Sequence, residues 1–327
     1  MILLSAGLTI LSLLAGAVHG PFASQNHKSK VVIGYVQDYA DSPTPALDQI
    51  DFKKITHLNV AFANPTDADG NLSVPPSLAE IVGQAHQNGV KVLISIGGGG
   101  VSEDAKARQL YFDLISDKNR AGFVQKLAAY VDSNQLDGLD VDLEGPAINK
   151  DYEAFVAELA KDLKPKKKLL TAAVSAWFGG DQITAKAFGH FDLINVMAYD
   201  ATGPWDKTKP GQHSSMEYTK KSVDYWLNRG VPKSKLVLGV PFYGYGFGDA
   251  FTKDGYTFAQ IVSQYPGSEA KDEVGNTIWY NGIPTIRAKV KYVLEEDFAG
   301  VMIWSIDQDA KGDQSLLSAI HDSLLNK

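Results

Sequence analysis

Short apolar runs recur along the chain, and longer segments with apolar residues at helical spacing lie between them. Runs of this length that are rich in β-branched residues are typical of strands. After a polar stretch at 24–30, eight such runs occur, at residues 31–36, 58–63, 91–96, 136–143, 169–176, 193–198, 236–242 and 301–306. Intervening segments such as 120–134, 152–163 and 216–228 are amphipathic and long enough for helices that connect parallel strands.

This order of strands and helices predicts an α/β fold with a parallel sheet. Eight strand–helix units in about 300 residues match the size of a (β/α)8 TIM barrel, with right-handed connections. No internal repeat, low-complexity segment or Pro- and Ser-rich linker divides the chain. We therefore predict a single barrel domain over residues 31–327, with an open, doubly wound parallel sheet as the alternative.

One connection is longer than a barrel requires. Residues 247–283 separate the seventh predicted strand from a helical segment at 284–296. We therefore expect a modest insertion between strands 7 and 8. Because long connections at the carboxyl ends of barrel strands surround the active site, the insertion is expected to form one wall of it.

The run 136–144 reads Leu-Asp-Gly-Leu-Asp-Val-Asp-Leu-Glu. Successive side chains on a strand point to opposite faces, so Asp140, Asp142 and Glu144 share one face. Neighbours on that face are roughly 6–7 Å apart, and at low dielectric they are not all ionised near neutral pH. The pattern predicts acid–base catalysis, in which the deep Asp140 can hold a proton, Asp142 can share it and Glu144 at the barrel mouth can deliver it.

Three other interpretations of these acids fit the sequence less well. A solvated acidic face would normally interleave Lys or Thr with the acids. A calcium loop of the EF-hand type needs a bidentate Glu at its twelfth position, which is Asp151 here. A magnesium site for phosphoryl transfer needs a phosphate cradle, and no Lys with Ser or Thr follows the glycine run 97–100.

A second candidate group lies on the sixth predicted strand, where Met197 and Tyr199 share a face and Asp200 follows at the end. The Tyr199 hydroxyl would donate a hydrogen bond to substrate. Aromatic residues also occupy the predicted strand ends: Tyr35, Phe62, Trp177, Trp205, Tyr243 and Trp304. Flat rings beside carboxyl groups suit pyranose sugars. The seven histidines form no His-x-x-x-His pair, so we expect no metal and no cofactor.

Charge and composition narrow the partners. A net charge of −7 disfavours nucleic acid and anionic membranes, and a neutral substrate fits better. The chain is 44% hydrophobic and has no cysteine, so packing alone must stabilise it. Residues 1–18 are uncharged, which predicts a signal peptide over 1–20 and a secreted or periplasmic protein. Because no Lys or Arg precedes the apolar run, a membrane anchor is the alternative.

The motifs resemble those of a known family, the family 18 glycoside hydrolases. The family signature Asp-Gly-x-Asp-x-Asp-x-Glu is matched completely at residues 137–144. Ser95-Ile-Gly97-Gly98 resembles the third-strand motif of the family, Met197-Ala-Tyr199-Asp200 the sixth-strand motif and Trp304 the eighth-strand tryptophan. Gly34-Tyr35 and Pro241-Phe242-Tyr243-Gly244 fit its first and seventh strands, so the likeness covers the chain after residue 30.

The resemblance implies a chitinase-like TIM-barrel enzyme that hydrolyses β-1,4 linkages between N-acetylglucosamine units with retention. It implies that Glu144 is the general acid and then the base, that Asp142 orients the acetamido group and that Asp140 poises Asp142. Tyr199 would hydrogen-bond the acetamido oxygen, and Asp200 would support that site. Tyr35 and Ser95 would tune Asp140, and Trp304 would form the floor of the sugar subsite. Further residues expected to line the substrate site are Phe62, Gly97, Gly98, Met197, Trp205 and Tyr243.

Two departures from the family bear on the substrate. Gly99 and Gly100 stand where many members have a tryptophan platform for the leaving group. The connection before the last strand is shorter than the inserted domain of deep-cleft members, so we expect endo-type cleavage by a monomer without a separate chitin-binding module. The alternatives are an endo-β-N-acetylglucosaminidase on N-glycans or peptidoglycan, and a non-catalytic lectin, which would be expected to have lost the acid.

Overall fold

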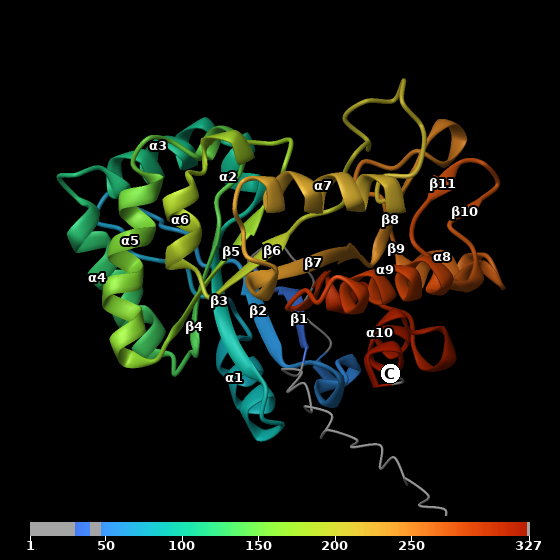
Figure 1. Ribbon diagram of the computed structural model, residues 1–327, viewed down its shortest axis with the longest axis horizontal. Coiled ribbons are helices and arrows are strands. Elements are labelled where there is room, and N and C mark those ends of the chain that lie inside the picture. The colour runs from blue at the N-terminus through green and yellow to red at the C-terminus, as the bar shows by residue number, and fades with distance from the viewer. Residues whose placement is uncertain (1–29, 40–46, 326–327) are drawn as a thin grey trace, which may run out of the picture.

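The computed structural model describes residues 30–39 and 47–325, so the signal peptide expected at 1–20 lies outside the described residues. Eight parallel strands close into a barrel in the order β1-β12-β7-β6-β5-β4-β3-β2. Their bounds are β1 Val31–Gln37, β2 His57–Ala61, β3 Lys91–Gly97, β4 Gly138–Asp142, β5 Leu169–Val174, β6 Leu193–Val196, β7 Leu236–Pro241 and β12 Gly300–Trp304. This closure confirms the predicted TIM barrel and shows that the open, doubly wound alternative is wrong (Figure 1).

Each predicted apolar run overlaps one of these strands, and the bounds agree to within two residues. The predicted runs are longest relative to the strands at β4 and β6, whose ladders end at Asp142 and Val196. The difference arises because Leu143 and Ala198 stay buried after the strands end, so the apolar pattern continues into the connections. The apolar pattern therefore indicates burial, which continues along the chain for one or two residues beyond the last residue that is hydrogen-bonded in the strand.

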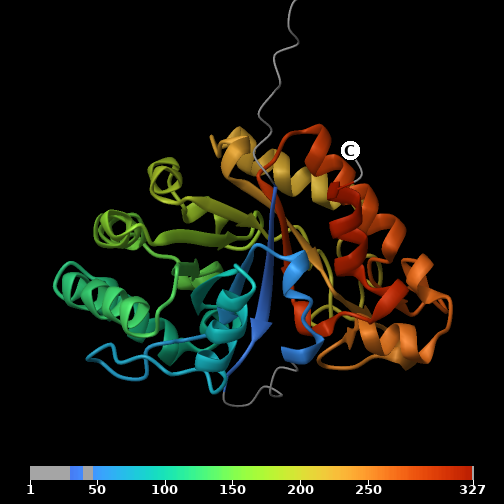
Figure 2. The ribbon, with the colours of Figure 1, turned by 90° about the horizontal axis from the view of Figure 1, so that it is seen from below.

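Helices cover the outside of the barrel, as the view from below shows (Figure 2). They are α1 Leu78–Gln87, α2 Gly99–Glu103, α3 Ala105–Ile115, α4 Arg120–Ser133, α5 Tyr152–Leu163, α6 Ala185–His190, α7 Met216–Asn228, α8 Phe258–Gln264, α9 Ile283–Glu295 and α10 Leu316–Leu325. Side-chain caps fix where several begin. The Asp104 carboxylate accepts a hydrogen bond from the backbone N–H of Lys106, and the Ser215 hydroxyl accepts one from that of Tyr218.

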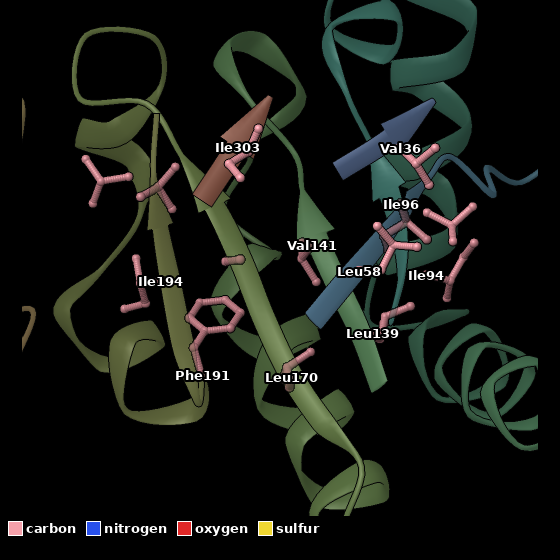
Figure 3. Packing of buried hydrophobic residues seen from close by; sticks show 14 of the residues in the cluster. Val36, Leu58, Ile94, Ile96, Leu139, Val141, Leu170, Phe191, Ile194 and Ile303 are labelled. Atoms are coloured by element: carbon pink, nitrogen blue, oxygen red, sulfur yellow. The ribbon is translucent and has the colours of Figure 1, made fainter. Parts of the chain in front are cut away.

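The core has two layers because alternate side chains of each strand face opposite ways. The outward layer packs between strands and helices, and Leu58, Ile94 and Leu139 in it are fully buried (Figure 3). Burying one such side chain stabilises the fold by about 1.5–3 kcal/mol. The inward layer fills the barrel with Ile33, Tyr35, Ala61, Tyr199, Val237, Tyr243 and Met302. Three of these inward residues are tyrosines, so the barrel interior carries hydroxyl groups near its mouth.

The insertion between β7 and α9 forms a small antiparallel sheet. Its strands are β8 Tyr243–Gly246, β9 Tyr256–Thr257, β10 Glu273–Val274 and β11 Ile278–Trp279, in the order β10-β11-β8-β9, and α8 follows β9 (Figure 1). A capping box between Thr257 and Gln260 starts α8. The predicted insertion is confirmed, although it begins at β8, just after Phe242, rather than at residue 247. Among the residues that the structure describes, no helix combines the length and apolar character needed to span a bilayer.

Candidate active site

The three acids predicted from the β4 alternation form a column that follows β4 and the residues just after it toward the barrel mouth. Asp140 is 0% exposed and Asp142 4%, whereas Glu144 is half-buried. The hydrogen-bonded strand ends at Asp142, two residues before Glu144. Glu144 nevertheless keeps an extended backbone with φ −133° and ψ 161°, so the alternation continues to the mouth. We refer to Asp140, Asp142 and Glu144 as the acidic column.

Asp140 lies in a ring of hydrogen-bond donors. The hydroxyls of Tyr35 and Ser95 each donate to Asp140 Oδ2 at 2.7 Å. On the other oxygen, the Thr171 hydroxyl donates at 2.5 Å and the Asn195 amide at 3.5 Å. Burial raises the pKa of Asp140, and the donors oppose that rise because they stabilise the carboxylate.

Asp142 has no comparable support. Burial raises the pKa of Asp142 well above its usual range, and the charges on Glu144 and Asp140 raise it further. Among the described residues, none provides a hydrogen-bond partner for the buried Asp142 Oδ1. The surroundings therefore favour Asp142, rather than the deeper Asp140, as the acid that holds the proton, which differs from the order expected from depth alone.

The surroundings of Glu144 raise its pKa into the neutral pH range. Burial raises its pKa to about 7, with further contributions from the negative charges of Asp200 and Glu103. A carboxyl group with a pKa near the working pH can give up a proton and take it back, which general acid–base catalysis requires. The Ser102 hydroxyl donates to the Glu144 carbonyl at 2.7 Å and fixes the backbone there.

Gly97 and Gly98 allow β3 to pass close to the acidic column. Both have positive φ angles, 102° and 85°. A Cβ atom on Gly97 would lie 2.3 Å from the Asp142 carbonyl oxygen, and one on Gly98 would lie 2.6 Å from the Phe62 ring. The structure therefore assigns these predicted substrate-site residues a role in packing, because any side chain there would displace Asp142 or Phe62.

An aromatic floor lies beside the column. The Trp304 ring stacks on Phe62 at 5.9 Å between centroids and tilts against Tyr35 at 5.5 Å. Met197 packs in the same interior cluster, and the Tyr199 ring contacts that of Tyr243 edge-on at 6.2 Å. These residues, predicted separately on different strands, are therefore brought together in one aromatic cluster beside the acidic column.

Asp200 is held at the carboxyl end of β6 by donors from the insertion. The hydroxyls of Tyr243 and Tyr245 donate to Asp200 Oδ1 at 2.5 and 3.1 Å. The His213 ring places Nδ1 3.3 Å from the same oxygen. Asp200 itself has a positive φ of 63°, which turns the chain away from the strand. The insertion thus orients a carboxylate whose charge acts on Glu144.

The outer aromatics are set apart from the floor. Trp205 is 63% exposed and its ring contacts Tyr245 edge-on, 5.6 Å between centroids. Trp177 is 57% exposed and packs on Tyr225, so it lies outside the floor. A hollow of about 460 Å³ runs from Trp177 to Asp200 and is lined by Trp177, Asp200, Ala201, Tyr218 and Lys221. These rings suit outer contacts with a longer ligand.

A larger hollow, of about 600 Å³, lies beside α9 and α10 and includes none of the acidic column in its lining. The Asp309 carboxylate in this hollow accepts hydrogen bonds from the backbone N–H groups of Leu316 and Leu317. Asp309 therefore caps the start of α10, and its carboxylate in this hollow has a structural role at the N-terminus of that helix.

The structure also decides against the calcium-loop interpretation. Asp140 and Asp142 belong to a barrel strand, and Asp151 lies at the start of α5. Across the described residues, no group of three or more His, Cys, Asp or Glu side chains is arranged to hold a metal ion.

Comparison with known proteins agrees with this geometry. A family model for glycosyl hydrolases family 18 matches residues 31–309. The chain belongs to this family. The GH18 chitinase ChiB from the chitin utilization locus of Flavobacterium johnsoniae shares 40% sequence identity and superposes with a TM-score of 0.84, over 91% of this chain and 94% of that chain.

Two other relatives extend the comparison. A chitinase from Cycas revoluta, solved with (GlcNAc)3, is 25% identical with a TM-score of 0.76, over 90% of this chain and 99% of that chain. A chitinase-like effector of Moniliophthora perniciosa is 32% identical over 253 residues, 67% of this chain and 56% of the effector. The chain spans less than two thirds of the length of such curated relatives.

Sequence reasoning missed several polar residues of this family 18 barrel. Thr171 and Asn195 donate to Asp140, and Tyr245 and His213 contact Asp200. It also missed Phe178, 47% exposed, whose ring covers Gly145 beside Glu144. The available signal was a single polar residue inside an otherwise apolar strand, as Thr171 is in β5 and Asn195 in β6.

Proposed function

We propose that the protein hydrolyses β-1,4 linkages between N-acetylglucosamine units with retention of configuration and with the substrate's N-acetyl group as nucleophile. The observation that carries the proposal is the acidic column, in which a donor-supported Asp140, an unsupported Asp142 and a Glu144 with a pKa of about 7 follow one another outward. Family membership and the (GlcNAc)3 ligand of the Cycas chitinase support the substrate class.

The first step cleaves the glycosidic bond. Glu144 gives its proton to the glycosidic oxygen, and the acetamido carbonyl oxygen of the sugar over Trp304 attacks C1 as the leaving sugar departs. The result is a cyclic oxazolinium ion. Asp142 accepts a hydrogen bond from the acetamido N–H and passes its proton to the Asp140 carboxylate, so that its own charge stabilises this cation, while Tyr199 donates to the acetamido oxygen.

The second step reopens the ring. The Glu144 carboxylate takes a proton from water, and the water oxygen attacks C1 from the side that the leaving group vacated. The bond between C1 and the former acetamido carbonyl oxygen breaks, and the acetamido group is restored. Because C1 has been substituted twice, configuration is retained. Glu144 ends the cycle protonated, and a pKa of about 7 suits both directions of transfer.

Binding energy comes from the floor and its surroundings. The Trp304 ring, backed by Phe62 and Tyr35, would stack on the sugar that reacts. Asp200 with Tyr243 and Met197 would hold its hydroxyl and acetamido groups, and Trp205 would contact a sugar further along. Contacts that strengthen as the ring distorts lower the barrier more than they lower KM.

A second candidate activity, endo-β-N-acetylglucosaminidase, is favoured by one observation. A Cβ atom on Gly99 would lie 3.8 Å from Glu144 Oε1, and one on Gly100 would meet nothing within 4 Å. The leaving side beside the acid is therefore open backbone, which has room for a branched or protein-linked leaving group.

The proposal includes the setting in which the enzyme works. Residues 31–327 would act as one catalytic domain, exported by residues 1–20 to a secreted or periplasmic location and active as a monomer without metal or cofactor. The net charge of −7 suits a neutral glycan and repels nucleic acid and anionic membranes.

A product profile tests the function directly. The purified protein is incubated with chitin oligosaccharides, an N-glycoprotein and a muropeptide, and the products are identified by mass spectrometry. We expect cleavage of the chitin oligosaccharides at internal bonds, with β-configured first products. Exclusive release of glycans from the glycoprotein would favour the second candidate, and binding of all three without cleavage would overturn both and leave a lectin.

A further inference from the structure

Lys289 on α9 is a buried ammonium group that the proposed reaction does not use. The residue is 0% exposed. Burial lowers the pKa of Lys289 to about 7, and the negative charge of Asp272 opposes that change only in part. An apolar side chain of the same length would be easier to bury, so the contacts of this ammonium need an explanation.

All three hydrogens of the ammonium group are used. Lys289 Nζ donates to the Ser214 carbonyl at 2.8 Å, to the Ser214 hydroxyl at 2.6 Å and to Asn281 Oδ1 at 2.7 Å. The Ser214 hydroxyl in turn donates to the Ala198 carbonyl at 2.7 Å, next to Tyr199. Lys289 therefore joins α9, the insertion and, through Ser214, the end of β6.

His213 connects this group of contacts to Asp200. The ring is fully buried between Tyr243 and Tyr245, with centroid distances of 5.0 and 4.9 Å. Nε2 lies 3.3 Å from the Tyr243 carbonyl oxygen, which can only accept, so Nε2 carries a hydrogen. Nδ1 then accepts a hydrogen bond from the Asp200 backbone N–H at 3.4 Å, and it lies 3.3 Å from Asp200 Oδ1.

The segment 213–214 is thus fixed on both sides. Toward the barrel mouth, the Ala201 backbone N–H donates to the His213 carbonyl at 3.0 Å. Away from it, Lys289 holds both the carbonyl and the hydroxyl of Ser214. A displacement of Ser214 would be passed to the adjacent His213 ring and from there to Asp200.

We propose that Lys289 is a positioning residue, which holds Ser214 and His213 so that the Asp200 carboxylate stays in place against the mouth of the acidic column. The inference rests on the proposed function, in which Glu144 delivers the proton. The charge of Asp200 raises the pKa of Glu144, so loss of its position would lower that pKa. The other ionisable groups acting on Glu144 and its neighbour Asp142 are Glu103 on α2 and Asp140 on β4, and Asp272 is the charged group acting on Lys289.

The test replaces Lys289 by the similarly sized, apolar Met. Lys289→Met is compared with Lys235→Met, because Lys235 also donates to backbone carbonyls, those of Phe188 and Gly189. We expect Lys289→Met to lower kcat about tenfold with little change in KM, and to move the basic limb of the pH profile down by about half a unit. A kcat and a basic limb equal to those of Lys235→Met would overturn the inference and leave Lys289 a structural clamp.

A double-mutant cycle tests the route through His213. If Lys289 acts through that ring, His213→Gln alone should shift the basic limb in the same direction, and adding Lys289→Met should add little more. Fully additive shifts would contradict the route. If Lys289→Met does not fold, Ser214→Ala takes its place in the cycle, since it removes one acceptor of the ammonium and the bond to Ala198.

One readout does not depend on turnover. The carboxyl band of Glu144 can be titrated by infrared difference spectroscopy and identified by its loss in Glu144→Gln. If the wild-type protein cleaves no oligosaccharide, the proposed function fails, and the inference is still judged by whether Lys289→Met lowers the pKa read from this band. An unchanged band titration would overturn the inference alone.

Discussion

Asp140 at the deep end of the acidic column and Glu144 at its mouth are both carboxyl groups removed from water, but their neighbours differ. Four neutral donors from four strands surround Asp140. The charges that act on Glu144 are those of Asp200 and Glu103, both negative. The deep end therefore favours a carboxylate, and the mouth favours a protonated acid that can release its proton.

The difference shows that depth alone does not decide which acid is ionised. Burial raises the pKa of both groups, but hydrogen-bond donors oppose the rise at Asp140, whereas negative charges add to it at Glu144. Asp142 lies between these two environments with a pKa raised well above its usual range. Asp140 supplies a fixed negative charge on one side of Asp142, and Glu144 supplies a transferable proton on the other. Under these conditions the protonation of Asp142 can change when an acetamido group binds.

The largest effect is expected at the mouth. Glu144→Gln should lower kcat by a factor on the order of 10² or more while ligand binding and folding are kept, because it removes a proton donor without changing shape. The control is Glu295→Gln on the outer face of α9, where the carboxylate pairs with Lys291. Initial rates on a chitin oligosaccharide provide the measurement. A variant that keeps more than about a tenth of the rate would mean that another group is the acid.

The next largest effect is expected when the substrate, rather than the protein, is changed, and it tests the role of Asp142 in the middle of the acidic column. An oligosaccharide that lacks the acetyl group on the sugar over Trp304 should be cleaved about 10² times more slowly or not at all, because the nucleophile is missing. A thiazoline mimic of the cyclic intermediate should inhibit. Fast hydrolysis of the deacetylated substrate, or a trapped glycosyl ester, would instead make Asp142 the nucleophile.

The pH profile sharpens the contrast between the two ends. The reaction needs Glu144 protonated, and its pKa of about 7 lies above the usual value for a glutamic acid. Activity measured as kcat/KM should therefore fall about tenfold for each pH unit above pH 7. In Asp200→Asn this basic limb should move to lower pH, because a negative charge near Glu144 is lost. A wild-type limb near pH 4.5 would contradict the assignment of the raised pKa.

Sequence reasoning located the strands and the acidic column because both are local patterns. A period of two residues along β4 is sufficient to put Asp140, Asp142 and Glu144 on one side. The apolar runs gave the remaining strands to within a few residues, since the runs alternate with amphipathic helices of regular length. The resemblance to family 18 added Tyr35, Ser95 and Trp304, which the structure places around the same site.

The residues that were missed are those whose partners lie on other strands. In the barrel register, the missed Thr171 on β5 is a direct partner of Asp140. That register depends on how strands of the whole barrel are staggered, which no local pattern contains. His213 and Lys289 were missed for the same reason, because each gains its role only when the insertion folds against the end of β6.

The smallest effect is expected at Asp140, the deep end of the acidic column, when the hydrogen bond from Thr171 is removed. Thr171→Val removes the hydroxyl that donates to Asp140 and keeps the shape, so the pKa of Asp140 should rise. Because activity needs the Asp140 anion, the acid limb of the pH profile should move up, by about 0.7 pH unit if the hydrogen bond contributes near 1 kcal/mol. Thr171→Ser should keep the wild-type limb.

The matched control is Thr219→Val, since Thr219 is also fully buried and its hydroxyl has no hydrogen-bond partner among the described residues. That substitution should leave the acid limb in place. If Thr171→Val and Thr219→Val give the same limb as the wild type, the donors around Asp140 only stabilise the barrel, and the two ends of the column differ in packing rather than in charge. A shift confined to Thr171→Val would instead show that the Thr171 hydroxyl on β5 keeps Asp140 ionised. The charge on Asp140 would then be what keeps the proton on Asp142.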